Sequence, residues 1–229
     1  MIKLNMPPLN SVKTYIEGGY YHIYNRGVDK RKIFQRDLDY SVFLRLLKEY
    51  LLPIDHPDLL KIQGIIPRRK PLNCYDDIEL ISYCLMPNHF HLLIRQKSKY
   101  GLKRFSKALL TNYSMYFNKT YERTGRLFQG VYKAVLILDE SYFLHLSRYI
   151  HLNPSELLAR DNPLHKYKYS SYKYYIGINC PDWLNPKPIL QMFQNDKSQF
   201  PSKILTYQSF VENYKENERE LLGRFTLED

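Results

Sequence analysis

The sequence predicts an α+β domain built on a single antiparallel sheet. Three observations carry this prediction. Apolar residues recur with both the strand and the helix period, the two kinds of segment alternate along the chain, and two strand segments are joined by a tight turn. The 229 residues are enough for one sizeable core with appendages, and no internal repeat divides them.

Four short segments rich in aromatic and branched apolar residues are expected to form the strands. The first, YYHIYN, is closed by Arg26 and Gly27. The second and third are joined at Met86, Pro87 and Asn88, where proline and asparagine favour a tight turn, so we expect a hairpin. The expected strands cover residues 20–25, 78–85, 89–95 and 131–138.

Apolar residues that fall three or four positions apart predict amphipathic helices between and after these strands. Pro53 ends the first helix, and Asp139 is the expected N-cap of the third, which ends before Pro154. Residues 53–77 contain four prolines and a basic run at 68–70, so we expect a loop there. The expected helices cover residues 37–52, 102–117, 140–153 and 207–222.

In chain order the first six of these elements are β, α, β, β, α, β. This order is typical of a ferredoxin-like (RRM-like) unit, in which one antiparallel sheet carries helices on one face. The third helix is additional to that unit. We therefore expect a ferredoxin-like domain with one extra helix, followed by a C-terminal extension over residues 179–229.

The charge of the chain is positive and unevenly distributed. There are 34 Lys and Arg against 23 Asp and Glu, which gives a formal net charge of +11, and there are 22 tyrosines. Residues 179–229 hold six basic and eight acidic side chains, so this part is about −2 and the first 178 residues are about +13. Such a charge favours a polyanionic partner, and we expect residues 1–178 to bind it.

Nucleic acid is a better candidate for that partner than a membrane. No stretch approaches the roughly 18 apolar residues of a spanning helix, and MIKLNMPPLN lacks the apolar core of a signal peptide. We therefore expect a cytoplasmic protein with no membrane partner. The cysteines Cys74, Cys84 and Cys180 are odd in number and form no CxxC pair, which excludes a disulfide framework and a zinc ribbon.

His89 and His91 flank Phe90 in an expected strand. Side chains alternate between the faces of a strand, so both imidazoles point to one face and can bind a single divalent ion. Short motifs of this kind also recur by accident, and two hydrogen-bonded structural histidines are the alternative interpretation.

A metal needs more ligands, and phosphodiester chemistry needs a nucleophile. Tyr149 and Asn153 are four residues apart on the third expected helix, so their side chains lie on the same side. No other tyrosine of these helices has an amide at that spacing. The alternative is that Tyr149 is an aromatic at the edge of the core and that Asn153 is a C-terminal helix residue.

Five segments in chain order carry a more specific signal than any of these pairs alone. Together they resemble the single-tyrosine HUH transposases of the insertion-sequence-200-like type, and the REP-associated tyrosine transposases are the most similar branch. The segments are YYHIYNRG (20–27), MPNHFHLLI (86–94), TGRLFQG (124–130), RYIHLNP (148–154) and YSSYKYYIG (169–177).

The resemblance implies a catalytic domain over residues 1–178 and a reaction. His89 and His91 would be the two histidines of the HUH motif, Asn153 the third ligand of a Mg²⁺ or Mn²⁺ ion, and Tyr149 the nucleophile. Enzymes of this kind cleave and rejoin single-stranded or hairpin DNA, such as REP-like palindromes, through a 5′-phosphotyrosine. A cation that withdraws charge from the phosphate lowers the barrier to this attack.

Basic side chains interleaved with aromatic ones can neutralise phosphates while the tyrosines stack on unpaired bases. The positions of Arg26 and Lys133 in the family pattern make them the first candidates for DNA contact, and Arg126 and Arg148 are the others. Two further functions stay open. One is a protein that binds folded single strands without cutting them. The other is a zinc-stabilised module that uses Cys84 with the two histidines. Monomer and homodimer, with the tyrosine acting in cis or in trans, also stay open.

Overall fold

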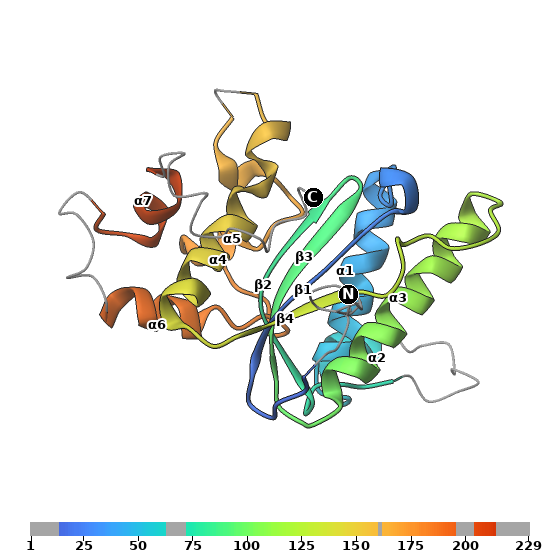
Figure 1. The fold of residues 1–229 in the computed structure, drawn as a ribbon, viewed down its shortest axis with the longest axis horizontal. Coiled ribbons are helices and arrows are strands. Elements are labelled where there is room, and N and C mark those ends of the chain that lie inside the picture. The colour runs from blue at the N-terminus through green and yellow to red at the C-terminus, as the bar shows by residue number, and fades with distance from the viewer. Residues whose placement is uncertain (1–13, 63–71, 160–161, 196–203, 214–229) are drawn as a thin grey trace, which may run out of the picture.

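The structure is a computed structural model that describes residues 14–62, 72–159, 162–195 and 204–213. At its centre lies a four-stranded antiparallel sheet with helices on both sides (Figure 1). The strand order is β2-β3-β1-β4, which is the order of the expected ferredoxin-like unit. The strands are β1 (Tyr20–Arg26), β2 (Ile78–Met86), β3 (His89–Gln96) and β4 (Lys133–Ile137).

The helices fall into two groups on the two sides of the sheet (Figure 1). The first group is α1 (Asp37–Leu51), α2 (Pro57–Ile62) and α3 (Gly101–Thr120), and it includes the helices of the ferredoxin-like unit. The second group is α4 (Glu140–Leu152), α5 (Tyr172–Tyr175), α6 (Lys187–Asn195) and α7 (Tyr207–Glu212). Three short 3-10 helices, η1 (Val28–Lys30), η2 (Asn153–Leu157) and η3 (Leu164–Lys166), complete the described elements.

One face of the sheet is mainly apolar and packs against α1 and α3. On β3 this face is formed by Phe90, Leu92 and Ile94, which are at most 1% exposed. They meet Phe43 of α1 and Phe105 of α3 in one continuous core. Because alternate residues of a strand point to opposite faces, this packing fixes the orientation of the histidines between them.

The other face of the sheet is covered by α4. Leu93 and Ile137 pack there against Phe143, Leu146 and Ile150 of that helix. Asp139 caps α4 as expected, because its carboxylate accepts a 2.7 Å hydrogen bond from the backbone N–H of Tyr142. The extra helix therefore lies on the sheet face opposite α1 and α3.

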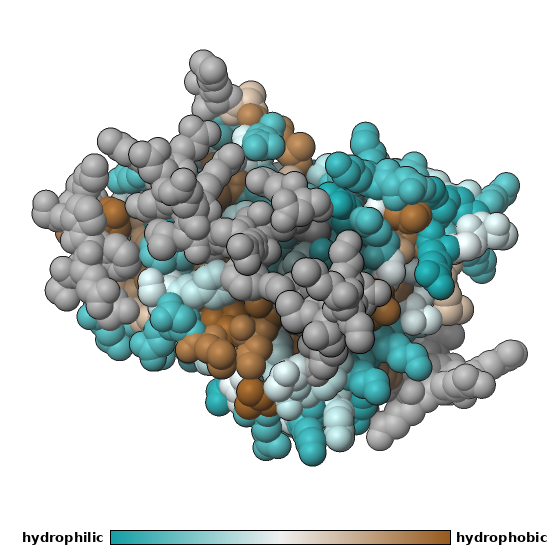
Figure 2. Space-filling view, in the orientation of Figure 1, coloured by the Kyte–Doolittle hydropathy of each residue, from teal (hydrophilic) through white to brown (hydrophobic). Residues whose placement is uncertain are grey.

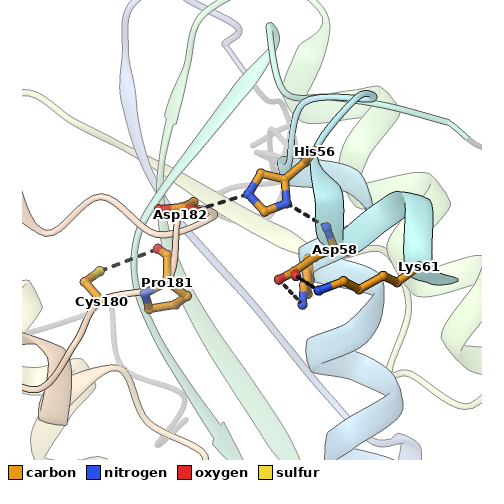
Figure 3. A network of polar contacts seen from close by, with 7 residues as sticks. His56, Asp58, Lys61, Cys180, Pro181 and Asp182 are labelled. Carbon is orange, nitrogen blue, oxygen red and sulfur yellow. Dashed lines mark hydrogen bonds and ion pairs between the residues drawn. The ribbon is translucent and has the colours of Figure 1, made fainter.

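Residues after 178 cover α4 in turn. Ile189 and Phe193 of α6 and Phe210 and Val211 of α7 belong to the same core as α4. A second attachment runs to the other group of helices, where the carboxylate of Asp182 lies 3.1 Å from the Nε2 atom of His56 (Figure 3). The described parts of the extension thus pack on the domain at two places.

Three expectations about the chain outside the sheet need correction or lie outside the described residues. The expected loop at 53–77 contains α2, whose first residue is a proline, a favourable position because the first helical N–H has no acceptor. Helices α5 and α6 were not expected. The expected helix 207–222 is described only as far as Glu212, and the basic run at 68–70 lies outside the described residues.

Candidate active site

The two histidines of the HFH segment begin the third strand. His89 and His91 lie on the sheet face that α4 covers, and their ring centroids are 5.0 Å apart. Their cross-strand neighbours on β1 are Arg26 and Tyr24. The two-residue turn at Pro87 and Asn88 puts His89 at the end of the sheet, so it is half-buried, whereas His91 is fully buried.

Helix α4 brings Tyr149 to these histidines, and Asn153, the residue at its C-cap, comes with it. The ring of Tyr149 stands edge-on to His91, with 5.4 Å between centroids. The Oδ1 atom of Asn153 lies 3.3 Å from Nε2 of His89. The amide of Asn153 also donates a 2.9 Å hydrogen bond to the carbonyl of Tyr149, which fixes its orientation. The structure therefore brings together all four residues that the sequence suggested.

A third histidine, His22 on β1, belongs to the same cluster and was missed in the sequence. Its Nε2 atom lies 2.8 Å from Nδ1 of His91, and the two rings are stacked. The available signal was its place in YYHIYN, where alternation puts it on the same face as Tyr24. Its partner depends on the pairing of β1 with β3, in which His22 lies opposite Leu93 and diagonal to His91.

The contacts of His89 put two hydrogen-bond acceptors face to face. Its Nδ1 atom lies 2.7 Å from Oδ1 of Asn88, an acceptor, so this nitrogen carries the proton. Its Nε2 atom then presents a lone pair to Oδ1 of Asn153, which is also an acceptor. Burial lowers the pKa of His89 to about 4, so a doubly protonated ring does not relieve this contact at neutral pH. A cation bound by both Nε2 of His89 and Oδ1 of Asn153 would relieve the contact between these two acceptors.

His91, whose ring centroid lies 5.0 Å from that of His89, supplies a further candidate ligand atom. Its Nε2 atom is buried and has no hydrogen-bond partner among the described residues. Burial lowers the pKa of His91 well below its usual value, and that of His22 to about 3, so both rings are neutral. Neutral imidazole nitrogens and an amide oxygen suit a divalent ion, and the residues present therefore fit one.

The zinc-stabilised module is not supported. Within the described ranges no group of three or more His, Cys, Asp or Glu side chains could hold a metal ion. Cys84 lies opposite His91 on β2, but it is fully buried beside the core under α4, and burial raises the pKa of its thiol. A buried neutral thiol is a poor ligand.

The four basic candidates fall in different surroundings. Lys133 is exposed at the start of β4, with its amine 5.6 Å from the ring centroid of Tyr24. Arg26 is half-buried beside His89, and Arg126 is exposed before β4. Arg148 is only 5% exposed and lies 4.5 Å from the ring centroid of Phe210. The structure therefore does not bring Arg148 to the face that holds the histidines.

Two of the other motif segments pack beside the strands that carry the site. The TGRLFQG segment lies along the end of β1, where the backbone N–H of Gln129 donates a 2.8 Å hydrogen bond to the carbonyl of Arg26. The YSSYKYYIG segment lies along β2, where the N–H of Ser171 donates to the carbonyl of Tyr83. Its Tyr172 is fully buried.

His151 anchors α4 from behind the site. It is fully buried, and its ring nitrogens each lie 2.8 Å from a hydroxyl, that of Tyr207 on α7 and that of Ser171. Tyr207 also lies 2.9 Å from the hydroxyl of Ser147 on α4. These bonds hold the turn of α4 that carries Tyr149, and a residue of the extension takes part in them.

Comparison with known proteins gives a family match and distant structural similarities. No curated protein matches the chain. A solved structure of a REP-associated tyrosine transposase bound to a REP hairpin is 13% identical, with 72% of this chain and 83% of that chain covered and a TM-score of 0.45. A protein of Deinococcus radiodurans R1 assigned as a transposase is 16% identical, with 61% and 94% covered and a TM-score of 0.35.

The family match covers the site itself. Residues 70–153 match the family described as IS200-like transposases, and this range contains His89, His91, Tyr149 and Asn153. By this match, residues 70–153 are similar to the IS200-like transposases.

Proposed function

We propose that the protein cleaves and rejoins single-stranded or hairpin DNA through Tyr149, with a divalent cation held by His89, His91 and Asn153. One observation carries this proposal. The lone pairs of His89 Nε2 and Asn153 Oδ1 face each other at 3.3 Å. The same cluster holds the ring of Tyr149 and His91, whose Nε2 atom has no hydrogen-bond partner in the part of the chain that the structure describes. A bound cation would satisfy all three donor atoms within reach of a tyrosine.

The chemistry needs a nucleophile and stabilisation of charge. When bound, the cation withdraws charge from a non-bridging oxygen of the scissile phosphate. The oxygen of Tyr149 gives up its proton and attacks phosphorus, the bond from phosphorus to the 3′ oxygen breaks, and that oxygen leaves as a 3′-hydroxyl. The product is a 5′-phosphotyrosine. Attack on it by a 3′-hydroxyl rejoins DNA and releases the tyrosine, so no external energy is needed.

The side chains of the protein place these groups before DNA arrives. Asn88 orients His89, and the bond from Asn153 to the carbonyl of Tyr149 orients the amide. Tyr149 and the histidines come from one chain here, and α4 is packed on its own sheet. This arrangement supports cleavage in cis, with a monomer sufficient for the reaction.

The two imidazole ligands bear on the choice of ion. Mg²⁺ prefers oxygen ligands in octahedral geometry, whereas Mn²⁺ accepts imidazole nitrogen more readily. The proposed set of two nitrogens and one oxygen therefore favours Mn²⁺ at equal concentration. Mg²⁺ remains usable because the substrate phosphate supplies further oxygen atoms.

Basic residues around the site supply a path for the DNA backbone. Arg26 and Lys133 lie on the same face of the sheet as the histidines. Arg126, which is also exposed, precedes Lys133 in the segment before β4. Figure 2 shows hydrophilic surface at the upper right, over the segment after β1 and the C-terminal end of α3. We propose that a hairpin such as a REP-like palindrome lies across this end, with its phosphates on these side chains.

The extension after residue 178 has a structural part in this proposal. Tyr207 bonds to His151 and Ser147 of α4, and Phe193 and Phe210 pack on the same helix. We propose that residues 1–178 form the catalytic domain and that residues 179–229 hold its tyrosine helix in place.

A covalent-adduct assay tests the proposed function. The full chain is incubated with a labelled hairpin oligonucleotide and Mg²⁺ or Mn²⁺, and a protein–DNA adduct that survives denaturing electrophoresis is expected. Tyr149→Phe should form no adduct. Tyr142→Phe is the matched control, because Tyr142 lies on the same helix near Tyr149, and it should still form one. Tight binding of the oligonucleotide with no adduct under any divalent ion would instead support a protein that binds folded single strands without cutting them.

A further inference from the structure

We propose that His22 is a positioning residue for the metal site: it accepts a hydrogen bond from Nδ1–H of His91 and so directs the Nε2 lone pair of His91 toward the cation. This inference rests on the proposed function. It adds a residue from β1, outside both the HUH motif and the residues 70–153 that match the family.

The geometry of the pair is close and enclosed. Nε2 of His22 and Nδ1 of His91 are 2.8 Å apart, a normal hydrogen-bond length. Both side chains are 0% exposed, so no bulk water competes for either atom. The rings are stacked at 5.1 Å between centroids, with 19° between their planes. His91 is therefore held by a partner that is itself fixed in the sheet.

A neutral pair of this kind has two proton arrangements. In the first, His91 carries its proton on Nδ1, donates to His22, and presents a lone pair at Nε2. In the second, His22 donates to His91, and Nε2 of His91 carries a proton instead. The outer atoms, Nε2 of His91 and Nδ1 of His22, are both buried without a hydrogen-bond partner among the described residues.

A cation distinguishes between these arrangements. Only in the first can the Nε2 atom of His91 bind a metal, and the number of unsatisfied buried atoms then falls from two to one. In the second, a proton occupies the position of the metal. Because Nε2 of His22 accepts a hydrogen bond from Nδ1–H of His91, it favours the tautomer of His91 that can bind a cation through Nε2.

The other proposed histidine ligand has a corresponding partner. Nδ1 of His89 lies 2.7 Å from Oδ1 of Asn88, so this ring also has an acceptor behind it. Histidines that bind metals usually donate their second N–H to such an acceptor. His22 would do for His91 what Asn88 does for His89.

A purely structural histidine looks different in this protein. His151 is also fully buried and neutral, but both of its nitrogens have hydroxyl partners 2.8 Å away. Among the described residues, His22 forms a hydrogen bond through one nitrogen only, and that bond goes to a proposed ligand. If the side chain at position 22 only filled space, an apolar side chain of similar size would stabilise the protein more than a histidine does.

The test compares two substitutions at His22 by the affinity of the full chain for Mn²⁺ without DNA, measured by electron paramagnetic resonance. His22→Leu removes the acceptor, and we expect the Kd for Mn²⁺ to rise about 10- to 100-fold. His22→Gln keeps an acceptor oxygen, and its affinity should lie near that of the native protein. His56→Gln, at a histidine bonded to Asp182 away from the site, should leave the affinity unchanged.

A second measurement uses the unaltered protein and does not depend on how the variants fold. Long-range ¹H–¹⁵N spectra of the histidine rings should show His91 protonated at Nδ1 when the protein is saturated with the diamagnetic ion Mg²⁺. Protonation at Nε2, or a folded His22→Leu variant that binds Mn²⁺ as tightly as the native chain, would overturn the inference. Equal weakening by Leu and Gln would also overturn it, since packing would then explain the effect. If the native chain binds no Mn²⁺, the metal site of the proposed function fails as well.

Discussion

The two faces of the sheet differ in the side chains that the same strands present to them. Toward α1 and α3, β3 presents Phe90, Leu92 and Ile94, which belong to the larger apolar core. Gln96, at the end of this strand, accepts a hydrogen bond from the backbone N–H of Leu102 on α3. Toward α4, it presents His89, His91 and Leu93, and only the last belongs to the apolar core. The first face is mainly apolar, whereas the second combines apolar packing residues with the histidines of the candidate site.

This difference shows how a small domain can carry a buried polar site. The free energy of folding comes mainly from apolar burial, which the face toward α1 and α3 provides. The second face can then hold three neutral histidines. Its own packing is completed by α6 and α7, which lie behind α4. We expect stability and chemistry to be separable by substitution on the two faces.

The largest expected effect on stability comes from the mainly apolar face of the sheet, which packs against α1 and α3. Phe90→Ala removes a ring that is 1% exposed and contacts Phe43 and Phe128, so we expect the free energy of unfolding to fall by about 3–5 kcal/mol. Urea denaturation followed by circular dichroism measures it. Met115→Ala, at a residue 65% exposed on α3, should change the value by less than about 0.5 kcal/mol. Equal effects of the two changes would refute the packing described for this face.

The neighbouring residue on the other face should show the opposite behaviour. His89→Ala removes a proposed ligand, and the rate of adduct formation should fall about 10³-fold, because a Lewis acid contributes several kcal/mol to such a barrier. His89 is only half-buried, so the free energy of unfolding should change by about 1 kcal/mol or less. Rapid-quench assays with a labelled hairpin measure the rate. A variant as fast as the native protein would remove His89 from the metal site.

A smaller effect is expected behind α4. Tyr207→Phe leaves Nδ1 of His151 without its hydroxyl and takes one bond from Ser147, which should cost about 1–3 kcal/mol of stability. Thermal unfolding measures it, and Tyr100→Phe, at a residue 56% exposed, is the matched control and should have no effect. No loss at Tyr207 would show that the extension does not anchor α4 through this hydroxyl.

The smallest effect is expected at the rim. Lys133→Ala should weaken binding of a hairpin several-fold and lower the slope of log K against log salt by about 1, because one phosphate contact is lost. Fluorescence anisotropy at several salt concentrations measures both. The control is Lys99→Ala, at an exposed lysine beyond the opposite end of β3, and its slope should equal that of the native protein. If both variants had the same slope, Lys133 would have no specific contact.

Local patterns were enough to predict most of the fold. The alternation of HFHLLI predicted which side chains share a face, and the turn at Pro87 and Asn88 joins the hairpin as expected. Asp139 caps α4 through a hydrogen bond to a residue three positions later. Each of these features depends on neighbours within a few residues, which a sequence displays directly. The short helix α2 was missed because its prolines favour a loop when no tertiary contact is known.

The features that could not be predicted depend on contacts between distant segments. His22 and His91 are 69 residues apart, and only the pairing of β1 with β3 brings their rings together. Arg148 precedes Tyr149 directly, yet a rotation of about 100° per helical residue turns it toward Phe210 of α7. Without α7 in place, nothing in the sequence separates Arg148 from an arginine that faces DNA. Within the described residues, no helix is long and apolar enough to cross a membrane.

The most direct test of the central claim is to find the residue that becomes attached to DNA. The full chain is incubated with a hairpin oligonucleotide and Mn²⁺, digested with protease and nuclease, and mapped by mass spectrometry. We predict a nucleotide linked by a phosphodiester to Tyr149, and no linked peptide when the metal is removed by a chelator. A link to another tyrosine, such as Tyr142 seven residues earlier on the same helix, would contradict the account.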